Sequence, residues 1–397
     1  MRFVATAAVA VQPRPPVTLP PPNREPLTFH RRLPGYAPTP LVNAPSLARR
    51  LGVEQVLVKD ESCRLGLPSF KILGASWAVY RAIRDRLGLA LPPWQTVDDL
   101  RVQLLPLGGM VLVTATDGNH GRAVARVATW FGCSARVFIP LGTVRARIDA
   151  IQAEGAEVTI VDGSYDEAVA LAATQSTAPR TLVIADTAQS EADAAAGWVI
   201  EGSSTIFFEV EDALARTGQS DPDVLAVQVG VGALAAPAVQ HYRGPNLAGE
   251  QRPRIVGVEP ERAACLLASM EAGRLISLSG VQDSIMAGLN WGTPSPVAWP
   301  LISRGMDLHL AIEDEYSRQA MRALAVEGVV SGESGAAGLG GLLALVDGWG
   351  AAPELRAIVG LNGSARVLLL STEGATDGLA YEQIVGRSPA SVVAQTA

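Results

Sequence analysis

The hydrophobic positions alternate between two patterns from about residue 53 onward. Short runs rich in Val, Ile and Leu predict buried strands, and the Ala-rich stretches of helical period that follow them predict helices. Strands are expected at 53–62, 110–116, 135–140, 157–163, 181–186, 224–230, 254–260 and 366–372. Helices are expected at 69–88, 119–132, 145–155, 166–176 and from about Gly232. Strands that alternate with helices form parallel sheets covered on both faces, which predicts an α/β fold.

Length and composition indicate how many domains the chain forms. A chain of 397 residues is too long for one ordinary core and suits two domains, and 48% of its residues are apolar. Residues 88–108 break the alternation and mark a candidate insertion at a domain junction. An apolar run follows Arg2, but the chain then becomes Pro-rich without a convincing signal-peptide cleavage site, so we expect an irregular lead-in over residues 1–26.

Charge and cysteine content argue against several classes of partner. The net charge of −7 argues against a nucleic-acid partner, because phosphate binding requires a basic face. No apolar run approaches the ~20 residues of a membrane span, so we expect no membrane partner. Cys63, Cys133 and Cys265 lie at no metal-site spacing, which predicts a protein without a metal site in a reducing cytoplasm.

Four segments at predicted strand exits hold residues suited to chemistry, since ligands of open α/β sheets bind beyond the carboxyl ends of the strands. In the first, Ser69–Lys71 (SFK) begin a helix, and Lys71 is one of two lysines in the chain, the other being Lys59. Desolvation at a helix start favours the neutral amine that imine formation requires. Taken alone, the segment is better explained by a lysine that extends from a helix end toward solvent.

Each of the other three segments also has a structural alternative. Thr114–Gly121 (TATDGNHG) lead into a helix whose free amides can hold a carboxylate, although capping by Asp117 or Asn119 explains the pattern too. Gln228–Pro237 (QVGVGALAAP) form either a glycine-containing phosphate loop or a close strand–helix packing. The last strand ends in Ser371–Thr372, where a hydroxyl can bond a heteroaromatic nitrogen or form an ordinary turn.

In this order, the four segments resemble the fold-type II pyridoxal-phosphate (PLP) enzymes, the group of tryptophan synthase β and the threonine dehydratases. Within that group, five motifs resemble the diaminopropionate ammonia-lyase family. They are DESCRLGLPSFKILG at 60–74, DGNHGR at 117–122, MAGLNWG at 286–292, SGESGA at 331–336 and STEGATD at 371–377. The resemblance extends over roughly residues 27–385.

The resemblance implies a fold and a reaction. Two open, twisted, mostly parallel sheet domains would hold pyridoxal 5'-phosphate in the cleft between them. The large PLP-binding domain would comprise residues 27–89 and 181–397, the small domain residues 90–180, and the enzyme would be a homodimer. The implied reaction is the α,β-elimination of ammonia from D- or L-2,3-diaminopropionate, which gives pyruvate and ammonia.

The resemblance also implies roles for individual residues. Lys71, with Phe70 beside it, would carry PLP as a Schiff base and then act as a catalytic base. Asn119 would bond the ring hydroxyl, and Ser371 or Thr372 would face the pyridine nitrogen. The phosphate would bind the backbone amides of Gly230, Val231, Gly232, Ala233 and Leu234.

Three carboxylate side chains restrict the class of substrate that the resemblance implies. Asp117 stands where the dehydratases have a hydroxyl, so it would be a second base opposite the lysine and would favour a substrate with a β-ammonium group. Asp186 would pair with the same amine, and Glu333 would help to hold the geometry of the site. The remaining substrate-binding candidates are Thr116, Gly118 and His120.

Two departures from the family leave the substrate open. Where the family commonly has Asp-Thr-(Ala/Ser)-Trp-Glu-Gly-Tyr, residues 186–198 read DTAQSEADAAAGW. A cysteine that some members have in the MAGLNWG motif is Trp291 here, which excludes a disulfide with Cys265. One alternative is a PLP-dependent β-eliminase or β-replacement enzyme that acts on serine, threonine, hydroxyaspartate or an acylated serine. Another is a catalytically silent relative that serves only in binding.

Overall fold

The computed structural model describes residues 2–5, 22–88, 91–116, 118–163, 165–178, 180–185, 187–188, 190, 192–244, 253–347 and 352–394. The chain folds as two compact units. The large unit comprises Met1–Asn23, Pro38–Cys63 and Ile206–Ala397, and the small unit comprises Arg24–Ala37 and Arg64–Thr205. No helix in the described part of the chain is long and apolar enough to cross a membrane.

The large unit is built on a seven-stranded sheet whose five inner strands are parallel. The two edge strands, β1 and β2, are antiparallel to their neighbours. Inner strand β8 is buried at every position, as expected for a parallel strand with both faces covered. The order is β1 (Arg2–Ala5), β10 (Leu308–Ile312), β9 (Arg254–Pro260), β8 (Val224–Gln228), β11 (Arg366–Ser371), β3 (Gln55–Asp60) and β2 (Leu41–Asn43).

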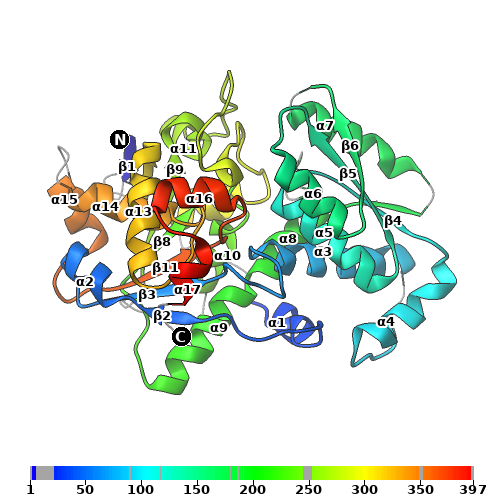
Figure 1. The fold of residues 1–397 in the computed structure, drawn as a ribbon, viewed down its shortest axis with the longest axis horizontal. Coiled ribbons are helices and arrows are strands. Elements are labelled where there is room, and N and C mark those ends of the chain that lie inside the picture. The colour runs from blue at the N-terminus through cyan, green and yellow to red at the C-terminus, as the bar shows by residue number, and fades with distance from the viewer. Residues whose placement is uncertain are drawn as a thin grey trace. The chain divides into compact units, whose positions relative to one another are not determined.

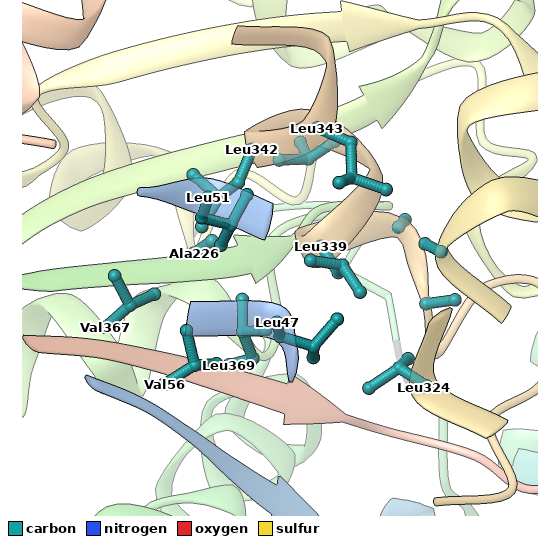
Figure 2. Packing of buried hydrophobic residues seen from close by; sticks show 14 of the residues in the cluster. Leu47, Leu51, Val56, Ala226, Leu324, Leu339, Leu342, Leu343, Val367 and Leu369 are labelled. Atoms are coloured by element: carbon teal, nitrogen blue, oxygen red, sulfur yellow. The ribbon is translucent and has the colours of Figure 1, made fainter. Parts of the chain in front are cut away.

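Helix α14 (Ala337–Val346) forms the centre of the large core. It is apolar on all sides and packs on β8, β9, β10 and β11. Figure 2 shows Leu339, Leu342 and Leu343 of this helix beside Ala226 and Leu369 of the sheet. The other helices of this unit are α2 (Pro45–Leu51), α9 (Thr205–Thr217), α10 (Ala235–Arg243), α11 (Cys265–Ala272), α12 (Trp299–Gly305), α13 (Asp314–Val326), α15 (Ala352–Val359), α16 (Gly378–Val385) and α17 (Pro389–Val393).

The small unit contains a four-stranded, fully parallel sheet in the order β6 (Glu157–Val161), β5 (Ser134–Pro140), β4 (Val111–Ala115) and β7 (Thr181–Val183). Helices α5 and α7 pack on β4 and β5, and α3 packs on α5 and α8 (Figure 1). The helices are α1 (Glu25–His30), α3 (Lys71–Leu87), α4 (Val97–Leu104), α5 (Asn119–Phe131), α6 (Arg145–Ala153), α7 (Tyr165–Thr174) and α8 (Ala194–Ser203).

The predicted α/β class with mostly parallel sheets is confirmed, and each predicted strand and helix of the sequence has a counterpart within a few residues. The compact units have other bounds than the predicted domains, since the small unit comprises Arg24–Ala37 and Arg64–Thr205, and the predicted domain division stays a prediction. The prediction of an irregular lead-in was wrong for Arg2–Ala5, which pair as an edge strand with β10. Such pairing depends on a partner strand some three hundred residues away, so local composition does not reveal it.

Candidate active site

The loop between β8 and α10 is shaped by close contacts at its glycines. Gly232 has a φ of +95°, in the region that side chains rarely adopt, and a Cβ there would lie 2.7 Å from Ile302 Cδ1. A Cβ at Gly230 would lie 2.6 Å from Trp291 Cδ1. Within the described residues, the amides of residues 230–234 donate to no backbone carbonyl. They are therefore available to an anion at the N-terminus of α10.

Strand β11, the neighbour of β8, ends in a buried hydroxyl group. The Ser371 side chain is 1% exposed, and its Oγ has no hydrogen-bond partner among the residues that the structure describes. Leaving such a group unsatisfied costs roughly 1–3 kcal/mol, so an acceptor on a ligand would stabilise it. Thr372 differs, because its Oγ1 accepts a hydrogen bond of 2.7 Å from Gln228 Nε2. The loop at residues 230–234, called the amide loop below, and Ser371 thus lie at the carboxyl ends of two neighbouring parallel strands.

The MAGLNWG, SGESGA and STEGATD motifs contact one another in the large unit. The Gly332 amide donates to Glu373 O at 2.9 Å, and the Ser334 amide donates to Glu373 Oε1 at 3.1 Å. The Gly288 amide donates to Ser334 Oγ at 3.0 Å. The buried carboxylate that joins these motifs is therefore Glu373, to which the sequence analysis gave no role. The predicted Glu333 is half-buried, and its carbonyl oxygen accepts from Ser317 Oγ at 2.7 Å.

Lys71 is the first residue of α3 in the small unit, and its side chain is half-buried. Phe70 occupies the N-cap position, and the Lys71 amide donates to Ser69 Oγ at 3.3 Å. The predicted helix start at residue 69 thus lies two residues before the observed one. The side chain of Lys71 projects from the first turn of a helix, where the helix dipole disfavours an additional positive charge.

A tight turn precedes Lys71. The amides of Arg64 and Leu67 donate to each other's carbonyl oxygens at 2.8 and 2.9 Å, and the two residues between them have positive φ. One of these is Leu65, with a φ of 53°, which is uncommon for a residue with a side chain. Arg126 Nη1 donates to Leu65 O at 3.3 Å, and the same guanidinium is paired with Glu154. These contacts hold the turn that leads into α3.

The exit of β4 supplies the second group of candidates in the small unit. Thr116 is buried and its Oγ1 accepts from the Gly118 amide at 3.1 Å, which fixes the turn before α5. Asn119 opens α5 and is half-buried. His120 is buried and donates from Nε2 to Ile184 O at 2.9 Å, so this ring joins α5 to the segment after β7. The predicted catalytic residues Asp117 and Asp186 lie outside the described residues.

The two lysines have different environments. Lys59 is buried in the large unit, where its Nζ donates to Glu209 Oε2 at 2.6 Å and to Thr39 O at 2.7 Å. Glu61 Oε1 lies 3.9 Å from the same nitrogen. These contacts hold Lys59 as a buried ammonium ion, since an ion at this depth requires charged partners. Lys71 is therefore the amine of the chain that is suited to covalent chemistry.

Comparison with known proteins identifies the family. Residues 32–359 match the family described as "Pyridoxal-phosphate dependent enzyme". Over 92% of its length, the chain is also 37% identical to 93% of the diaminopropionate ammonia-lyase of Salmonella typhimurium. The chain belongs to the pyridoxal-phosphate dependent enzymes, in the diaminopropionate ammonia-lyase family. The Escherichia coli K12 relative of the same name is 33% identical, over 90% of this chain and 89% of its own.

Solved structures agree with this assignment. The Escherichia coli diaminopropionate ammonia lyase in complex with an aminoacrylate-PLP azomethine reaction intermediate matches with a TM-score of 0.83 and 30% identity. That match covers 97% of this chain and 96% of the other. The same enzyme in complex with D-serine gives a TM-score of 0.82 at 32% identity, over 91% of this chain and 90% of the other. Threonine deaminase isoform 2 of Solanum lycopersicum, at 22% identity and a TM-score of 0.69, shares the fold.

The residues present fit PLP, the cofactor of this family. The cofactor carries a phosphate, a pyridine nitrogen and an aldehyde. The large unit offers unengaged amides at residues 230–234 for the phosphate and the unsatisfied Ser371 hydroxyl for the nitrogen. The small unit offers Lys71 for the aldehyde. No charged side chain is required at the phosphate, because the helix N-terminus attracts anions.

Trp291 stands in the MAGLNWG motif, at one of the two predicted departures from the family. Its indole covers Gly230, and its Nε1 donates to Gly288 O at 3.2 Å. Cys265 also reaches this glycine, since its Sγ lies 3.9 Å from Gly230 O. Cys265 is a free, buried thiol. At the position where the resemblance implies a cysteine in some members, this chain therefore has an aromatic contact against the loop at residues 230–234.

Proposed function

We propose that this protein eliminates ammonia from both enantiomers, D and L, of 2,3-diaminopropionate. One observation carries the proposal: the chain is 37% identical, over nearly the full length of both proteins, to a diaminopropionate ammonia-lyase. The site supports it, because the amide loop, the Ser371 hydroxyl and Lys71 match the three functional groups of PLP. In this reaction one diaminopropionate and one water give one pyruvate and two ammonia molecules.

The residues would divide the work as follows. When bound, pyridoxal phosphate supplies an electron sink that acidifies the Cα–H bond of an amino acid joined to it. Lys71 holds the cofactor and afterwards removes the Cα proton at its Nζ. Asn119, half-buried at the start of α5, bonds the ring hydroxyl. Ser371 bonds the pyridine nitrogen in preference to Thr372, because Gln228 already engages the Thr372 hydroxyl.

The β-amino group is the leaving group in this proposal. Removal of the Cα proton leaves an electron pair that forms the Cα–Cβ double bond as the Cβ–N bond breaks, and the amine departs with a proton as ammonia. Asp117 attracts the β-ammonium group of the substrate and serves as the base for the second enantiomer. Asp186 pairs with the same amine. The Escherichia coli relative has been solved with D-serine, which supports a site open to D-amino acids.

The changed run after Asp186 favours a second candidate. Residues 186–192 keep Asp186 and Thr187 but lack the aromatic pair of the family segment. A segment changed in this way allows recognition of another leaving group, such as the hydroxyl or acyloxy group of serine-like substrates. The chemistry at Lys71 would be the same, and only the recognition of the leaving group would differ.

The decisive experiment is a pyruvate assay on D- and L-diaminopropionate beside D- and L-serine. We expect both diaminopropionates to be used at least ~10-fold faster than either serine, because a carboxylate at the site selects the ammonium group. Lys71→Ala should remove the visible absorbance of the bound cofactor and all turnover. Asp117→Asn should lose D-isomer turnover well before L-isomer turnover.

Faster turnover of serine would instead support the second candidate. A visible band that persists in the Lys71→Ala protein would contradict the lysine assignment. Equal losses on both isomers in Asp117→Asn would contradict the role of that carboxylate as a second base.

We further propose a homodimer in a reducing compartment. The three cysteines are free, which supports a reducing environment. Light scattering on the eluting holoenzyme tests the assembly, with twice the 41.5 kDa chain mass expected for the dimer. A peak at the single-chain mass would contradict it.

A further inference from the structure

The side chain of Gln228 connects three segments around the proposed pyridine contact. It is buried, with 3% of its surface exposed. Its Nε2 donates to Leu370 O at 3.0 Å, to Gly335 O at 3.1 Å and to Thr372 Oγ1 at 2.7 Å. One amide group thus joins the end of β8 to the end of β11 and to the SGESGA motif.

The position of Gln228 follows from a gap in the sheet. The pairing of β8 with β11 stops at Ala226 and Leu369. On its other side β8 stays paired with β9 as far as Gln228, and β11 stays paired with β3 as far as Ser371. The two central strands therefore separate over their last residues while their outer partners hold them. The Gln228 amide bonds the Leu370 carbonyl, which regular pairing would otherwise satisfy.

The amide also distinguishes the two neighbouring hydroxyls. A glutamine amide has two N–H hydrogens, and three acceptors surround this one. The Thr372 oxygen is thereby fixed toward Gln228, whereas the adjacent Ser371 hydroxyl keeps no partner among the described residues. Thr372 directly follows Ser371, the last residue of β11, so a single peptide group joins the two residues. Fixing Thr372 therefore also fixes the direction of Ser371.

We propose that Gln228 is a positioning residue for the cofactor: it holds the end of β11 so that Ser371, and not Thr372, bonds the pyridine nitrogen. The proposal rests on the proposed function only through the assignment of Ser371 to that nitrogen. Gln228 itself touches neither the cofactor nor the substrate in this role. Its effect reaches the ring through Leu370 and Thr372.

The first test is a double-mutant cycle on the holoenzyme, with PLP affinity and the absorbance of the bound cofactor as readouts. Gln228→Met keeps the size of the side chain and removes its donors, and Ser371→Ala removes the hydroxyl. We expect each single change to weaken PLP binding about tenfold, the value of one good hydrogen bond. The double variant should bind no more than about twofold more weakly than Ser371→Ala, because both changes remove the same contact.

Ser317→Ala is the matched control. It removes a buried hydrogen bond of 2.7 Å to Glu333 O in the SGESGA motif, but Ser317 makes no hydrogen bond to β11 in the described structure. Ser317→Ala should lower thermal stability without shifting the absorbance of the bound cofactor. Any loss of PLP affinity that it causes should multiply with the loss caused by Ser371→Ala. If Gln228→Met behaves in the same way as this control, Gln228 is only a structural residue and the proposal is overturned.

Gln228→Glu provides a second readout if the Met variant folds poorly. A carboxyl group facing Leu370 O and Gly335 O is expected to hold its proton at low pH and to donate one hydrogen bond. PLP affinity of this variant should therefore fall as pH rises, more steeply than in the wild type. Parallel pH profiles would overturn the proposal. A wild type that binds PLP but releases no ammonia from diaminopropionate would contradict the proposed reaction and leave these binding results standing.

Discussion

At the scale of single residues, Gly232 shows how backbone conformation and packing together constrain the amide loop. Its φ is +95°, and the space beside its Cα is filled by Ile302 of α12. A lone Gly-x-Gly in the sequence does not distinguish a phosphate loop from close packing. Close packing is observed here, and it is compatible with a phosphate loop, because the amides of residues 230–234 donate to no backbone carbonyl among the described residues.

Gly232→Ala should weaken both folding and cofactor binding. The positive φ costs about 1–2 kcal/mol for a residue with a Cβ, and contact with Ile302 Cδ1 adds to this by shifting the loop. Gly273→Ala is the matched control, because Gly273 has a φ of +66° but nothing within 4 Å of its Cβ position. Both variants should unfold at lower urea concentration, but only Gly232→Ala should lose PLP affinity, by tenfold or more. Equal PLP affinity in the two variants would contradict a phosphate role for this loop.

Sequence alone predicted roles for the amide loop and Lys71 but did not separate Ser371 from Thr372. Both are hydroxyls at the same strand end, and the difference between them is a hydrogen bond from Gln228, 144 residues away in sequence. Glu373 was missed for the same reason, because its contact with the Ser334 amide is also long-range. Local patterns thus predict which segments carry chemistry, and tertiary contacts decide which atom of a segment is available.

At the scale of elements, the strands and helices that alternate along the chain were predictable, but the membership of α3 and α8 in the small unit was not. These two helices contact closely because Gly202 and Gly74 lie at the crossing. A Cβ on Gly202 would lie 2.7 Å from Leu73 O, in the first turn after Lys71. The segment that holds Lys71 is therefore positioned by a helix more than 120 residues later, which periodicity does not reveal.

A buried carboxyl group of β9, which bonds the start of α11, makes folding depend on pH. It belongs to Glu259, which accepts from the amides of Leu266 and Leu267, both at 2.8 Å. Burial raises its pKa from 4.5 to about 8, against the opposing effect of these two hydrogen bonds. The Glu259 carboxyl group lies near the amide loop, since the neighbouring Cys265 reaches Gly230 O.

Between these pKa values the native state holds a proton that the unfolded chain has lost. The stability due to this group is therefore complete below pH 4.5 and is lost as pH rises through about 8. In that window its contribution should fall by up to ~1.4 kcal/mol per pH unit. Urea unfolding at several pH values should show a flatter profile for Glu259→Gln, which keeps the shape but does not ionise. Parallel profiles for the two proteins would mean that Glu259 is already ionised in the native state.

At the scale of the whole molecule, the proposed cofactor contacts are divided between the two compact units. Lys71 and Asn119 belong to the small unit, and residues 230–234 and Ser371 belong to the large one. A ligand that makes more of these proposed contacts should bind the native state more tightly and stabilise it more at a given concentration, because binding to the native state alone shifts the unfolding equilibrium.

This division predicts a ranking of ligands on the apoenzyme. PLP at about 100 times its Kd should raise the free energy of unfolding by ~2.7 kcal/mol. Inorganic phosphate, which engages only the amide loop, and pyridoxal, which lacks the phosphate, should each give less at the same concentration. Lys71→Ala should keep part of the PLP effect, because its large-unit contacts remain, whereas Gly232→Ala should lose most of the phosphate effect. Urea unfolding with each ligand measures these shifts, and an equal shift from PLP and inorganic phosphate would contradict the proposed contacts of Lys71, Asn119 and Ser371.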